Sequence, residues 1–137
     1  MNKYLQALSV VPSMLLPAAI YALTMPFSSM DSVISAWRTA SGDVTSLTIG
    51  HMIIVIALFC VGTEIIKATR MSALGMADHV ASLALLLVMA LAYIAAPGFG
   101  SAVFFILMLM QTVDVAIGVI VSVSVARRDF TGAPFGS

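Results

Sequence analysis

Four long apolar stretches dominate the sequence and exclude most soluble folds. Each is close to the roughly 20 residues that an α-helix needs to cross a bilayer. They cover residues 4–27, 47–66, 76–96 and 101–126. Of the 137 residues, 61% are hydrophobic and only 9% are charged, whereas a soluble domain carries about 25% charge. We therefore predict an all-α integral membrane protein, a single-domain bundle of four transmembrane helices over residues 1–137.

The basic residues predict how the four helices cross the membrane. With four crossings, both chain ends lie on one side, and all but one of the lysines and arginines then share that side. These are Lys3, Lys67, Arg70, Arg127 and Arg128, and only Arg38 falls on the other side. Because loops rich in Lys and Arg stay in the cytoplasm, we expect a multi-pass protein of the plasma (inner) membrane with both termini cytoplasmic.

Two prolines interrupt the first apolar stretch. Pro12 and Pro17 lack the backbone N–H that a helix needs, so we expect a kinked helix with Ser9 and Ser13 near the kink. The alternative is a secretory signal peptide that begins at Lys3. The length of the stretch, its prolines and the lack of a clear cleavage site favour a retained helix.

An amphipathic pattern falls in the longest connection, between the first two stretches. Apolar residues recur there at helical spacing, namely Met30, Val33, Ile34 and Trp37. We therefore predict a short interfacial helix over residues 29–38, with Trp37 as its anchor at the headgroup level. Alternatively, this apolar face packs on the outer end of the bundle or binds an external partner.

An acid lies near the middle of the fourth apolar stretch. Asp114 shares one helix face with Gln111, Gly118 and Ser122, at spacings of three, four and four residues. A charge at the bilayer centre costs about 2.5–3.5 kcal/mol, so we expect Asp114 to be protonated or paired. Gln111 is placed to hydrogen-bond to it, while Gly118 and Ser122 allow another helix to approach closely.

A second polar pair is predicted near the inner end of the second stretch. Glu64 and Lys67 are three residues apart, and we expect them to form an ion pair. Glu64 lies roughly 10 Å nearer the cytoplasm than Asp114 if both helices span the membrane. The two acids are therefore candidates for a proton or cation path.

Other chemistry finds no support in the sequence. His51 and His79 fall near opposite membrane faces, so they are not expected to ligate one haem or metal ion, and Cys60 is the lone cysteine. No catalytic, metal-binding or cofactor motif occurs, and the net charge is zero. We expect a protein that is not an enzyme and has no metal, no cofactor and no nucleic-acid partner.

Two functions remain open, and the sequence favours the first of them. In the first, the protein is an accessory or assembly subunit of a larger membrane complex, and Asp114 is a buried polar contact between helices. In the second, it is a small oligomeric transporter or channel coupled to protons or cations through Asp114 and Glu64. The expected partners are the lipid bilayer and either other membrane subunits or further copies of the chain.

Overall fold

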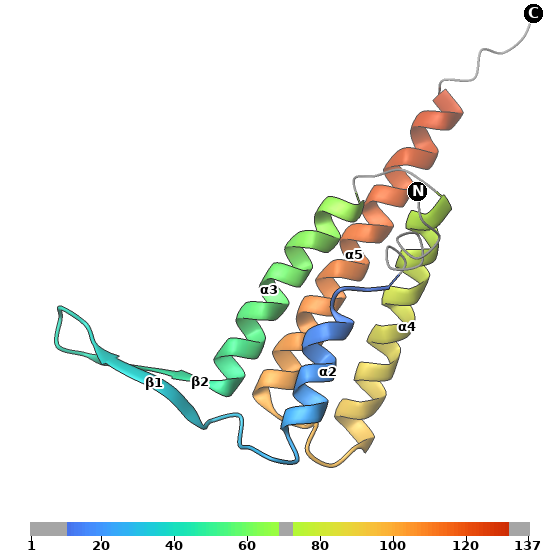
Figure 1. Cartoon of the computed structure of the whole chain (residues 1–137). Helices are drawn as coiled ribbons and strands as arrows, with labels where there is room; N and C mark the ends of the chain where they lie inside the picture. Colours follow the sequence, from blue (N-terminus) through green and yellow to red (C-terminus); the bar gives the residue numbers. More distant parts are fainter. Residues whose placement is uncertain (1–10, 69–72, 132–137) are drawn as a thin grey trace, which may run out of the picture.

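The computed structural model describes residues 11–68 and 73–131, which form a helical bundle with a β-hairpin at one end (Figure 1). The described helices are α2 (Leu15–Thr24), α3 (Ile49–Ala68), α4 (Ala73–Ala95) and α5 (Ala102–Thr131). The hairpin consists of β1 (Val33–Arg38) and β2 (Val44–Thr48). The prediction of a mostly helical chain is confirmed, but the all-α class is wrong because of the hairpin.

Three of the helices are long and apolar enough to cross a membrane. The qualifying stretches are Ile49–Ala68, Ala77–Ala95 and Ala102–Ser124. Their outward faces expose large aliphatic side chains such as Leu58, Leu91 and Ile120. Such faces suit contact with lipid, and the chain is compatible with a membrane protein.

The first apolar stretch forms only a short helix among the described residues. α2 has 10 residues, and residues 11–14 precede it outside the α-helix, with a turn at Ser13 and Met14. Pro17 contributes to this irregular start, because it has no N–H to donate to the Ser13 carbonyl. That carbonyl instead accepts a hydrogen bond from the Leu16 N–H at 3.0 Å. Residues 4–10 of the predicted span, which include Ser9, lie outside the described residues, as do Lys3 and Arg70.

The interfacial helix predicted over residues 29–38 is wrong, because this region contributes a strand. β1 and β2 pair antiparallel, with Ala36 opposite Ser46 and Trp37 opposite Thr45. Figure 1 shows the hairpin extending sideways from one end of the bundle. Val33, Ile34 and Trp37, predicted to lie on one face of a helix, are therefore residues of a strand.

Strand propensity and a turn explain this correction. Val33, Ile34 and Trp37 match a helix face by their spacing, but β-branched and aromatic residues are also enriched in strands. Gly42 has a φ of +95°, which glycine adopts at no steric cost, and it reverses the chain. The reversal brings Val44–Thr48 back along β1, so the first run gains a partner strand.

The half of the bundle nearest the hairpin is closed by apolar and aromatic side chains. The Tyr21 ring of α2 lies 5.7 Å from the Phe99 ring and 5.0 Å from the Phe104 ring, between centroids. The Tyr21 hydroxyl donates to the Gly98 carbonyl at 2.8 Å and lies 2.6 Å from Ser101 Oγ. We call the buried residues of this half the apolar core: Tyr21, Ile53, Met89, Phe104 and Leu107.

Candidate functional site: a polar cluster inside the bundle

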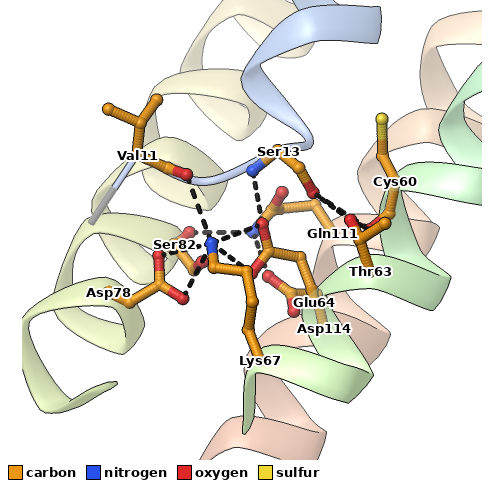
Figure 2. Close-up of polar contacts among 10 residues, drawn as sticks. All are labelled: Val11, Ser13, Cys60, Thr63, Glu64, Lys67, Asp78, Ser82, Gln111 and Asp114. Atoms are coloured by element: carbon orange, nitrogen blue, oxygen red, sulfur yellow. Dashed lines mark hydrogen bonds and ion pairs between the residues drawn. The ribbon is translucent and has the colours of Figure 1, made fainter. Parts of the chain in front are cut away.

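Polar side chains gather inside the other half of the bundle, where α3, α4 and α5 meet the segment before α2 (Figure 2). Most of them are buried and come from elements far apart in the sequence. We call six residues the polar cluster: Glu64 and Lys67 from α3, Asp78 and Ser82 from α4, and Gln111 and Asp114 from α5. The four polar candidates predicted for an ion-coupling role, Gln111, Asp114, Glu64 and Lys67, all belong to it.

Lys67 joins two of the acids. Its ammonium group lies 3.0 Å from Glu64 Oε2 and 3.2 Å from Asp78 Oδ2. It also donates a hydrogen bond to the Val11 carbonyl at 3.3 Å. The predicted ion pair between Glu64 and Lys67 is therefore present, and Asp78 extends it from α3 to α4.

The non-helical segment before α2 covers Glu64. The backbone N–H of Ser13 donates to Glu64 Oε1, and the Ser13 hydroxyl donates to the Cys60 carbonyl at 3.0 Å. The Thr63 hydroxyl also donates to that carbonyl, at 2.7 Å. In a membrane, irregular backbone is tolerated only where protein or water satisfies its polar groups. Glu64 does this for the Ser13 N–H.

A neutral amide is the hydrogen-bond partner of the Asp114 side chain. The Gln111 Nε2 group donates to Asp114 Oδ2 and to the Ser82 carbonyl, both at 3.1 Å. The Ser82 side chain also lies near Asp114. Asp114 is only 6% exposed, and no described lysine or arginine side chain forms an ion pair with it. The predicted hydrogen bond between Gln111 and Asp114 is present.

The Gln111 amide is satisfied on one side only. Its Nε2 group makes two hydrogen bonds, whereas its buried Oε1 atom accepts none from the residues that the structure describes. A buried acceptor without a partner costs about 1–3 kcal/mol. Gln111, which is hydrogen-bonded to Asp114, therefore has one buried acceptor atom, Oε1, that can still receive a hydrogen bond.

Gly118 makes room for the ring of His79. A Cβ atom at Gly118 would lie 2.4 Å from His79 Nδ1, so α4 and α5 approach closely here. His79 is also near enough to Asp114 to act on its charge. Ser122, predicted to share this packing face, is exposed and donates to the Gly118 carbonyl at 2.9 Å. The close approach therefore depends on Gly118 and not on Ser122.

His51 and Trp37 lie outside the polar cluster. The His51 N–H donates to Thr48 Oγ1 at 3.2 Å, and His51 Nδ1 accepts from the Thr48 N–H at 3.2 Å. This reciprocal pair caps the start of α3, as a capping box does. Trp37 is half-exposed on β1. Within the described residues, no group of three or more His, Cys, Asp or Glu side chains is placed to hold a metal ion.

The polar cluster extends from the middle of the bundle to one end. Asp114 lies about 18 Å from the start of the apolar stretch Ala102–Ser124 and about 15 Å from its finish, at 1.5 Å per residue. Lys67 is the penultimate residue of α3, and Asp78 is in the first turn of the stretch Ala77–Ala95. Polar groups therefore line the half of the bundle near the connection from α3 to α4, and the apolar core closes the other half.

Two members of the cluster, Asp78 and Ser82, were not among the predicted site residues. They are four residues apart, so they share one face of α4. That spacing was the available signal for a polar face on the third apolar stretch. It does not reveal that this face turns toward Lys67 and Gln111, because the rotation of one helix against another depends on contacts between distant residues.

The charge balance of the cluster is the main clue to its chemistry. The cluster contains three carboxyl groups and one ammonium group, which leaves a net charge of minus two if all are ionised and His79 is neutral. An uncompensated charge is expensive in an environment of low dielectric constant, so the cluster is suited to take up protons. No protein-family model, curated protein or solved structure matches the chain, and this clue comes from the residues alone.

Proposed function

We propose that the protein is a small membrane-embedded proton transporter or channel in which Asp114 takes up and releases the proton. The proposal is carried by one observation: Asp114 is buried inside its own bundle, where its side chain is hydrogen-bonded to the neutral Gln111 amide. Lys67 is engaged by Glu64 and Asp78. Binding a proton removes the cost of an unpaired charge, and intramembrane acids commonly mark proton pathways.

The polar half of the bundle supports a route for the proton on one side of Asp114. Gln111 is hydrogen-bonded to both Asp114 and the Ser82 carbonyl, and the ion pairs of Lys67 lie nearer the end of α3. The Lys67 side chain is 29% exposed, so the route reaches the surface of the bundle there. Under the predicted topology, this end of the bundle faces the cytoplasm.

The apolar core supports a closed state on the other side of Asp114. Phe104 is 2% exposed and Leu107 is fully buried, and neither side chain offers a group that binds a proton. A transporter that alternates its access would have to rearrange this half of the bundle. Because four helices enclose little space, the proposal includes assembly of several copies of the chain.

An accessory or assembly subunit is the second candidate function. It is favoured by the Gln111 amide, which joins α4 to α5 by binding both the Ser82 carbonyl and Asp114. In that case Asp114 serves only as a polar contact that fixes helix packing. Native mass spectrometry of the gently extracted protein separates the candidates, because a defined hetero-complex supports the accessory subunit and a homo-oligomer supports the transporter.

Proton flux into liposomes tests the first candidate. The purified protein is reconstituted with a pH-sensitive dye inside the vesicles, and a pH gradient is applied. Asp114→Asn keeps the shape of the side chain but cannot exchange a proton, so it should fold normally and conduct no protons. Asp31→Asn, in the exposed segment before β1, is the matched control and should conduct like the wild type. Wild-type flux no greater than in empty vesicles, or full flux with Asp114→Asn, would contradict the proposal.

A further inference from the structure

The β-hairpin is left uncovered by the rest of the described chain. All six residues of β1 are exposed, and the hairpin extends away from the helices (Figure 1). The exposed side chains include large apolar ones: Val33 is 59% exposed, Trp37 49% and Val44 67%. A two-stranded hairpin with no further packing is only marginally stable in water. Contact between its apolar side chains and lipid or protein would therefore stabilise the hairpin.

Backbone hydrogen bonds fix the base of the hairpin to the start of α3. The Ile49 N–H donates to the Ser32 carbonyl at 3.1 Å, and the Gly50 N–H donates to the Met30 carbonyl at 2.9 Å. A Cβ atom at Gly50 would lie 2.6 Å from a methyl carbon of Val103 on α5, so the contact is close. Because α3 and α5 are both capable of spanning a membrane, the hairpin emerges at the level where their apolar stretches begin.

The two faces of the hairpin differ in chemistry. Since opposite residues share a face, the register places Trp37 and Leu47 on one face, together with Ser35 and Thr45, and Arg38 and Val44 on the other. Arg38 is the single charged residue of the two strands. The hairpin therefore carries its tryptophan on one face, and its one cation beside Val44 on the opposite face.

We propose that the hairpin lies flat in the headgroup layer of the bilayer, with Trp37 toward the acyl chains and Arg38 toward the lipid phosphates. Tryptophan is enriched at this level of a membrane. The proposal requires that α3, α4 and α5 span the bilayer, and it is independent of proton transfer at Asp114.

The unpaired backbone groups along the edges of the hairpin support its position in the headgroup layer. A two-stranded sheet leaves N–H and C=O groups unpaired on both outer edges, which hydrocarbon cannot satisfy but headgroups and interfacial water can. Edge-to-edge pairing with a second copy is the competing arrangement. The irregular register between Val33 and Ser35 disfavours it, because a bulge twists a strand edge and interrupts its hydrogen-bonding pattern.

Fluorescence quenching of the protein in lipid vesicles tests the proposal, because Trp37 is the only tryptophan in the chain. The full chain is reconstituted in phosphatidylcholine vesicles that contain lipids brominated either near the headgroup or near the chain ends. We expect Trp37 emission to be lost mainly with the shallow bromines and little with aqueous iodide. In a Trp37→Phe background, Leu109→Trp on the exposed face of α5 is the control, and it should be quenched mainly by the deep bromines.

Three results would overturn the proposal. Strong iodide quenching of Trp37 without lipid quenching would place the hairpin in water. Protection from both quenchers would mean that protein covers Trp37, as a second copy or another subunit would. Failure of the deep bromines to quench the Leu109→Trp control would show that the bundle is not inserted. The proton proposal fails separately, through the flux of the Asp114→Asn variant.

Discussion

Replacing Lys67 by Met should destabilise the bundle by leaving two buried acids without a cation. The substitution keeps an unbranched side chain of similar length and removes only the ammonium group. Glu64 is 3% exposed and Asp78 is 4% exposed, and Lys67 is bonded to both. The Val11 carbonyl also loses a donor. Both carboxyl groups must then remain charged without a cationic partner or bind protons.

The expected magnitude follows from the burial of these groups. Removing one member of a buried ion pair costs about 3–5 kcal/mol. The Lys67 side chain is 29% exposed, so water compensates in part, and we expect the unfolding free energy to fall by about 2–3 kcal/mol at neutral pH. Acid neutralises Glu64 and Asp78, so the difference from the wild type should shrink as the pH is lowered.

Unfolding in mixed micelles of a mild detergent and sodium dodecyl sulfate measures this difference. Near-ultraviolet circular dichroism follows the loss of tertiary structure at neutral and at acidic pH. Adding Glu64→Gln and Asp78→Asn to the Lys67→Met variant should restore much of the stability, because the two acids that lost their cation are then replaced by neutral amides. Arg38→Met on the exposed hairpin is the control for loss of a cation. The reasoning is refuted if Lys67→Met unfolds like the wild type, or if the triple variant is as unstable as the single one.

The same unfolding assay checks two further predictions. Gly118→Ala should cost about 1–3 kcal/mol, because its Cβ atom would meet His79 Nδ1 at 2.4 Å. Gly62→Ala, which meets nothing within 4 Å, should be neutral or slightly stabilising, and equal effects of the two changes would argue against the close approach of α4 and α5. Tyr21→Phe should cost about 1–2 kcal/mol through lost hydrogen bonds. Tyr93→Phe, whose hydroxyl makes no hydrogen bond within the described part of the chain, should leave stability unchanged, and an equally stable Tyr21→Phe variant would contradict the role of that hydroxyl.

The long helices were predictable because length and apolar composition are local properties of the sequence. Residues 47–66, 76–96 and 101–126 overlap closely with α3, α4 and α5. The hairpin was not predictable from the same rules. Met30, Val33, Ile34 and Trp37 match a helical period, and only pairing with Val44–Thr48 makes this run a strand. Such pairing depends on a contact across a turn, which the spacing within one run does not contain.

The candidate site was predictable where its members lie on one helix. Gln111 with Asp114 and Glu64 with Lys67 are each three residues apart, and each pair is in contact. The contact of Asp78 with Lys67 was not predictable, because it links two helices whose relative rotation the sequence pattern leaves open. The hydrogen bond from the Ser13 N–H to Glu64 was not predictable for a different reason. It forms because Ser13 lies in the irregular segment before α2, whereas the sequence predicted a helix there.

Infrared difference spectroscopy of the protein in lipid membranes tests the central claim most directly. A protonated carboxyl group has a C=O stretching band that disappears when the group ionises. We predict a band that grows as the pH is lowered and that is absent from the Asp114→Asn variant, while Asp31→Asn retains it. A spectrum that Asp114→Asn leaves unchanged would show that Asp114 does not exchange a proton, and the proposed proton transport would then be wrong.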